Sequence, residues 1–141
     1  MSNTSDLYDR FVLFIRPNSN LRIDKLKQIS VWELVVVYDD GSRYIYDDMD
    51  QTARYYRPRD PRFEGLDEDE WREEFAHQVR RRMRLKGLNQ KQLAEEVMIS
   101  DMSMSNYLNC KRTPNGYIIE RFARVFGCPI SELVDFGYLY E

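Results

Sequence analysis

The sequence predicts an α+β protein, in which a small N-terminal unit with a β-hairpin is followed by an all-α domain of five helices. Three observations predict this class. Two β-rich runs flank an Asp-Gly pair near residue 40, a stretch rich in proline follows near residue 60, and apolar residues recur at helical spacing from residue 67 onward. We therefore expect two units, residues 1–65 and residues 66–141.

The N-terminal unit begins with "DRFVLFIRP", which is compatible with a strand or with the end of a helix, and "RPNSN" predicts a loop. The hairpin has expected strands at Val31–Tyr38 and Arg43–Tyr46. Its Asp40-Gly41 pair suits a type I′ turn, which needs positive φ at both central residues. An acidic pair then precedes "MDQTARYY", which favours a short helix, with a third strand as the alternative. "RPRDPRFEG" reads as a linker.

Five helices are predicted in the C-terminal half. The first has negative charge at its start, positive charge at its end, and apolar residues every fourth position. The others are recognised by a capping residue, an apolar face, or a terminal glycine. The expected helices are Asp67 to Lys86 before Gly87, Gln90–Val97 capped by Asn89, Asp101–Leu108 capped by Ser100, one containing Ile118 to Phe126 before Gly127, and one capped by Ser131.

Composition excludes several functional classes. The chain has two cysteines, Cys110 and Cys128, and one histidine, His77, which are too few for a disulfide framework or a structural zinc site. No nucleophile triad, phosphate-binding glycine loop or HExxH motif occurs. We therefore expect no enzyme activity, no catalytic residues, no metal and no cofactor. With no apolar run of about 18 residues and no signal-like N-terminus, we also expect a cytoplasmic protein without a membrane segment.

The net charge of −3 is unevenly distributed along the chain. Residues 1–71 carry a net charge of −5, residues 72–126 carry +5, and residues 127–141 carry −3. A basic segment beside an acidic one indicates a module that binds a polyanion next to a module that does not. The run Arg80-Arg81-Arg82 is compatible with a phosphate-facing role and with an ordinary solvated surface.

A short turn joins the second and third predicted helices, and the outer face of the third is small and polar. Ser103, Ser105 and Asn106 place hydroxyls and an amide on that face. Two helices joined in this way form a helix-turn-helix, and short side chains let the second helix approach base edges in the major groove.

The segment "GLNQKQLAEEVMISDMSMSNYLNCKRTP" followed by "IIERFARVFGCPISELVDF" resembles the lambda-repressor-like helix-turn-helix domains of phage and bacterial regulators. The resemblance spans about Asp67 to Phe136, half of the chain. The family pattern has a glutamine at the start of the second helix, a buried Leu-Ala pair, a Ser or Thr cap before the third helix, and then Asn-Gly-Lys-Arg-x-Pro. The matching residues are Gln90, Leu93, Ala94, Ser100, Asn109, Lys111, Arg112 and Pro114.

The resemblance implies which residues contact double-stranded DNA. Asn106 is the strongest candidate for reading a base, because an amide pairs bidentately with adenine. The implied base-reading residues are Asp101, Met102, Ser103 and Asn106, and the implied contacts to the DNA backbone come from Asn89, Gln90, Lys91, Ser100, Lys111 and Arg112.

Four positions depart from the family pattern. Met98 stands where the inter-helix turn usually has glycine, so we expect a strained positive φ there. Cys110 replaces a second glycine, which suggests that Asn109 adopts the left-handed conformation. Arg82 occupies a core leucine position, where Met83 is a possible substitute. Asp101 puts an anion near DNA, where it either accepts from cytosine N4 or weakens binding.

The leading functional hypothesis is a sequence-specific transcriptional regulator, a repressor of phage or mobile-element type, that acts as a homodimer on two-fold DNA sites. The alternative is a protein-binding inhibitor or antitoxin module in residues 1–65, with the helical domain serving autoregulation. The exposed edge of the hairpin and the C-terminal "DFGYLYE" are the two candidate dimerisation surfaces.

Overall fold

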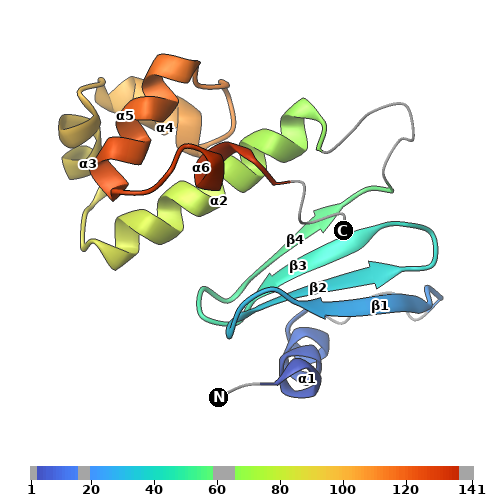
Figure 1. Cartoon of the computed structure of the whole chain (residues 1–141). Coiled ribbons are helices and arrows are strands. Elements are labelled where there is room, and N and C mark those ends of the chain that lie inside the picture. Colours follow the sequence, from blue (N-terminus) through green and yellow to red (C-terminus); the bar gives the residue numbers. More distant parts are fainter. Residues whose placement is uncertain (1–2, 16–19, 59–65, 137–141) are drawn as a thin grey trace. The chain divides into compact units, whose positions relative to one another are not determined.

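The computed structural model describes residues 3–15, 20–58 and 66–136. The chain divides into two compact units, Met1–Arg62 (unit 1) and Phe63–Glu141 (unit 2), and each is described by itself. Unit 1 combines one helix with an antiparallel sheet, and unit 2 is helical (Figure 1). The α+β class predicted from the sequence is therefore confirmed. The predicted linker centre, residues 59–65, lies outside the described residues.

Unit 1 is a four-stranded antiparallel meander with helix α1 (Thr4–Ile15) on one face (Figure 1). The strands β1 (Ile23–Gln28), β2 (Glu33–Tyr38), β3 (Arg43–Asp47) and β4 (Thr52–Tyr56) lie side by side in sequence order. Alternate residues of β2 point toward α1, as the two-residue period of a strand requires. The resulting core consists of Leu7, Phe11, Leu34, Val36, Tyr38 and Tyr46.

The predicted hairpin is present, but its turn differs from the expected type. Val35 faces Ile45 across β2 and β3, and only Gly41 of the Asp-Gly pair has a positive φ, of 87°. The Gly41 N–H donates to the Tyr38 carbonyl at 3.0 Å. A type I′ turn is therefore wrong, because it needs positive φ at both central residues.

Two other expectations for unit 1 were wrong or incomplete. The segment after Asp47 forms strand β4 and not a short helix, because the Asp47 carboxylate accepts from the N–H groups of Met49 and Asp50 at 3.0 Å and closes a tight turn. Strand β1 was missed because "IDKLKQ" is too polar to show a buried face. Since β1 and β4 flank the hairpin, neither hairpin strand has a free edge in the described sheet, which removes one candidate dimerisation surface.

The described part of unit 2, residues 66–136, contains five helices, as the sequence predicts. They are α2 (Glu68–Leu85), α3 (Gln90–Val97), α4 (Asp101–Leu108), α5 (Gly116–Phe126) and α6 (Ser131–Val134). Helices α4, α5 and α6 pack on α2, and α3 packs on α4 and α5 (Figure 1). The fully buried side chains of this core are Phe75, Val79, Leu93, Val97, Met104, Phe122 and Leu133.

The last helix differs from its prediction. Ser131 is the first residue of α6 and not its cap, and the residue before it, Ile130, offers no side-chain hydrogen bond to the helix. Helix α6 has only four residues. The Trp71 indole N–H donates to the Val134 carbonyl at 3.1 Å, so contacts with α2 hold this short element. Of the predicted C-terminal dimerisation segment, residues 137–141 lie outside the described residues.

The unit boundary changes where the acidic charge belongs. Residues 1–62 contain ten basic and ten acidic residues, so unit 1 is neutral and not acidic as the sequence division suggested. The acidity of the first half comes from residues 63–71, which contain five carboxylates and include the first turn of α2. In the described residues, no helix is both long enough and apolar enough to cross a membrane.

Candidate nucleic-acid interface

Helix α3 begins with a capping box that fixes the direction of its first N–H groups. The Asn89 side chain accepts from the Gln92 N–H at 2.8 Å, and the Gln92 side chain accepts from the Asn89 N–H at 2.9 Å. The opposite face buries Leu93, Ala94 and Val97. The side chain of Asn89 is therefore occupied in its own helix, while Gln90 and Lys91 stand on the outer side of the first turn.

The turn between α3 and α4 contains the strained residue that the sequence predicts. Met98 has φ 62° and ψ 46°, in the left-handed region. Its carbonyl accepts from the Arg121 guanidinium of α5 at 3.4 Å, and the next N–H, of Ile99, donates back to Ala94 at 3.0 Å. These bonds hold the tight angle between the two helices despite a backbone conformation that favours glycine.

Helix α4 presents a polar face to solvent. Ser100 caps it by accepting from the Ser103 N–H at 3.0 Å, and the Ser100 hydroxyl also contacts the Ser103 hydroxyl at 3.0 Å. Asp101 and Met102 are exposed, with Met102 at 76%, whereas Ser103 and Asn106 are partly exposed. The inward face buries Met104, Tyr107 and Leu108.

The C-terminal end of α4 is closed by Cys110 and by an arginine from α2. Cys110 has φ 62°, while Asn109 has φ −98°, so the expected left-handed Asn109 is wrong. The left-handed residue is the one that replaces glycine. The Arg80 guanidinium donates to the Leu108 carbonyl at 2.9 Å, which satisfies a helix-end acceptor. Burial, followed by the charge of Glu73, raises the pKa of the Cys110 thiol.

The loop after α4 is tied to the start of α2. The Arg72 guanidinium donates to the Thr113 hydroxyl at 2.7 Å, and that hydroxyl donates to the Glu68 carboxylate at 3.0 Å. Pro114 is buried next to it. These contacts fix the path of the preceding residues Lys111 and Arg112, which are exposed.

The basic side chains of unit 2 fall into two groups. Most are engaged within the unit: Arg82 contacts Glu132 at 3.1 Å, and Lys86 donates to the Val125 carbonyl at 2.6 Å. Among the described residues, the basic side chains of unit 2 without a hydrogen bond or ion pair are Lys91, Lys111 and Arg112. These three are also the basic residues predicted to contact the DNA backbone.

These contacts show the roles of Arg80 and Arg82, which the sequence left open. Arg80 and Arg82 belong to the fold, since one caps α4 and the other binds Glu132 and Gln78. Met83 is half-buried. Sequence reasoning missed Arg121, whose contact with the Met98 turn follows no motif, and Tyr117, an exposed aromatic in the first turn of α5.

A family model described as helix-turn-helix matches residues 79–133. The C-terminal half of the chain contains a Cro/C1-type helix-turn-helix domain. This family match supports a role of the domain in DNA binding and transcription regulation. The helix-turn-helix is formed by α3, the Met98 turn and α4, and helices α2 and α5 pack against it (Figure 1).

A solved structure is also similar to the chain. It is the crystal structure of the clp gene regulator ClgR from Corynebacterium glutamicum, with 18% sequence identity and a TM-score of 0.43. The similarity covers 50% of this chain and 71% of that chain. No curated protein matches the sequence.

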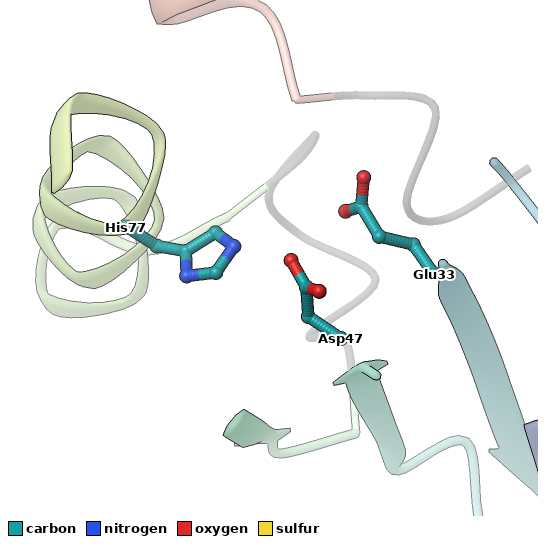
Figure 2. A group of neighbouring side chains, drawn as sticks. All are labelled: Glu33, Asp47 and His77. Carbon is teal, nitrogen blue, oxygen red and sulfur yellow. The ribbon is translucent and has the colours of Figure 1, made fainter. Parts of the chain in front are cut away.

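Figure 2 shows three titratable side chains outside the helix-turn-helix: Glu33 on β2, Asp47 on β3 and His77 on α2. Glu33 and Asp47 are cross-strand partners, and both carboxylates accept hydrogen bonds from turn residues of unit 1. His77 belongs to unit 2. The two carboxylates therefore serve the turns of unit 1.

Proposed function

We propose that this protein reads double-stranded DNA in a sequence-specific way, with α4 in the major groove. The observation that carries the proposal is the set of three unengaged cations. Lys91 lies in the first turn of α3, and Lys111 and Arg112 follow the C-terminal end of α4, so these cations belong to both helices of the helix-turn-helix. Lysine and arginine at the rim of a groove-reading helix neutralise phosphates and set its register. The remaining predicted backbone contacts, Asn89, Gln90 and Ser100, supply helix N-termini for the same purpose.

Four side chains of α4 would read base edges. The Asn106 amide suits adenine, and the exposed Met102 suits the methyl group of thymine. Asp101 suits the amino group of cytosine. The Ser103 hydroxyl already contacts Ser100, which orients it for a single outward hydrogen bond. Together these residues would recognise a short half-site.

We further propose that the protein binds as a homodimer and represses transcription. One helix of eight residues reaches too few base pairs for selectivity, so two half-sites about one helical turn apart would be read together. Binding at such a site would exclude RNA polymerase from an overlapping promoter. The resemblance to phage and bacterial regulators supports a repressor of phage or mobile-element type.

Alanine variants test the role of the cations. Lys91→Ala, Lys111→Ala and Arg112→Ala should each weaken binding to a mixed-sequence duplex and lower the magnitude of the salt dependence by about one per lost phosphate contact. Arg124→Ala is the matched control, because Arg124 is exposed but paired with Glu120 at 2.6 Å. Fluorescence anisotropy across salt concentrations measures both quantities. Equal effects of all four substitutions would contradict the proposal.

A further inference from the structure

We propose that one end of the unit 1 sheet is the surface through which two copies of this chain dimerise. The inference rests on the proposed function, which needs two copies to read a two-fold site. It names the surface that joins them. The surface is formed by the C-terminal end of α1, the β1–β2 turn and the β3–β4 turn, and we call it the turn-end surface.

The turn-end surface exposes five large apolar side chains. Leu13 is 77% exposed and Phe14 is 45% exposed, although both belong to the last turns of a helix that packs on the sheet. Val31, Trp32 and Met49 in the two turns are each at least 40% exposed. Exposed apolar residues grouped together mark an interaction site, whereas single ones have no such meaning.

Contacts through Asp48 show that these segments adjoin one another. The Asp48 N–H donates to the Trp32 carbonyl at 2.8 Å, which joins the two turns. The Asp48 carboxylate binds the Arg10 guanidinium of α1 at 2.9 Å and accepts from the Tyr46 hydroxyl at 2.7 Å. The Phe14 ring lies 5.8 Å from the Tyr46 ring, between centroids. A shallow pocket of ≈ 240 Å³ opens among Arg10, Leu13, Phe14, Tyr46, Asp48 and Gln51.

Charge favours a second copy as the occupant. A two-fold interface places the same patch on both sides, so the patch must be complementary to itself. Arg10 and Asp48 form an ion pair within this surface, and a two-fold axis between two patches would bring the Arg10 of each copy near the Asp48 of the other. Unit 1 has equal numbers of acidic and basic residues, so two copies approach without net repulsion.

Pairing of edge strands from two copies is the competing way to dimerise, and the charged residues of β1 disfavour it. This edge strand carries Lys25 and Lys27, and charged residues on an edge discourage addition of another strand. Leu26 on the same strand is also exposed but lies between these two lysines, and the exposed Ile23 is followed by Asp24. The apolar turn-end surface is therefore a better candidate than the β1 edge.

The test is the molar mass of the full chain in solution, measured by light scattering or sedimentation over a concentration series. Wild type should form a dimer, and Leu13→Lys should raise the dimer dissociation constant at least about tenfold by placing a charge at the centre of the interface. Lysine in a last helical turn suits the helix dipole, so α1 should remain folded. Leu85→Lys is the matched control, because Leu85 is also an exposed leucine in a last turn, at 66%.

Trp32→Lys provides a second variant on a different segment of the same surface, and circular dichroism checks that each variant is folded. Loss of the dimer in Leu13→Lys and Trp32→Lys, with the dimer kept in Leu85→Lys, is the expected result. A wild type that stays monomeric with and without DNA would overturn the inference and favour a foreign protein on this surface. A dimer unaffected by both substitutions would also overturn it.

Binding to a duplex with a single half-site separates this inference from the proposed function. If the DNA-reading proposal and the interface are both correct, Leu13→Lys binds a duplex with one half-site as tightly as wild type does. It loses only the additional affinity that wild type has for a duplex with two half-sites. If the chain shows no sequence preference but Leu13→Lys still abolishes the dimer, the DNA-reading proposal fails and the interface remains. If sequence preference and the dimer both persist in the variant, only the interface is wrong.

Discussion

At the scale of single residues, backbone conformation limits what the sequence can specify. Met98 and Cys110 both have φ 62° in positions that favour glycine. The departure at Met98 could be predicted because the turn needs a left-handed residue there. The corresponding choice between Asn109 and Cys110 could not, because asparagine is normally the better left-handed residue and the tertiary contacts of this helix end decide otherwise.

Met98→Gly should therefore stabilise unit 2. Glycine relieves a left-handed backbone strain of about 1–2 kcal/mol in the folded state. Because glycine also raises the conformational entropy of the unfolded chain, the net gain in the free energy of unfolding is at most about 1 kcal/mol. The exposed Met98 side chain contributes little packing. Urea denaturation measures the change. Gly127→Ala is the mirror control: Gly127 has φ 65° with open space around it, so this variant should lose stability for backbone reasons alone.

At the scale of elements, local signals predicted the helices and the hairpin, and non-local ones were missed. Capping residues and apolar spacing predicted the bounds of α3 and α4, because these two signals depend only on residues within or next to each helix. Strand β4 depends on pairing with β3, and β1 depends on pairing with β2, so their sequences alone were ambiguous or silent. The four-residue α6 depends on contacts with α2 for the same reason.

The cap of α4 should matter for stability because the helix is short. Ser100→Ala removes the acceptor for the Ser103 N–H and should lower the free energy of unfolding by about 1 kcal/mol. Ser105→Ala is a suitable comparison, since Ser105 lies inside α4 and its hydroxyl only accepts from the Asn109 side chain. Chemical denaturation followed by circular dichroism gives both values. Equal losses in the two variants would show that capping is not the cause.

Alkaline pH should destabilise unit 1. Burial raises the pKa of Tyr38 to about 12, and burial with the Asp48 hydrogen bond raises the pKa of Tyr46 to about 12. The unfolded chain loses these protons near pH 10 while the folded unit keeps them. Stability is therefore full below pH 10 and falls as pH rises from 10 toward 12. Thermal unfolding across this range tests the effect, and Tyr38→Phe together with Tyr46→Phe should flatten the dependence.

At the scale of the whole molecule, the chain joins a neutral unit of one helix and a sheet to a helical unit whose basic residues all lie in residues 72–126, a segment with a net charge of +5. The sequence indicated this division, but the linear charge count placed the acidic residues of α2 with the wrong unit. Only the folded boundary could correct it. The side-chain pairing that leaves Lys91, Lys111 and Arg112 unengaged was likewise outside the reach of sequence reasoning, because it depends on contacts between residues far apart in the chain.

The salt dependence of DNA binding should report the number of these cations. A dimer that uses all three from each copy would neutralise six phosphates, so the logarithm of the binding constant should fall with the logarithm of salt concentration with a slope of about −5. Anisotropy titrations with a mixed-sequence duplex at several KCl concentrations give the slope. A slope near zero would mean that the basic side chains do not face DNA.

The most direct test of the central claim is selection of bound duplexes from a random DNA pool, with wild type and Asn106→Ala compared at physiological salt. We expect wild type to enrich a palindrome with half-sites about one helical turn apart. In Asn106→Ala one position of each half-site should relax, at a cost of about 1–3 kcal/mol on the preferred sequence. Absence of any enriched sequence, or an identical preference in the variant, would contradict the assignment of α4 as the reading helix with Asn106 in the groove.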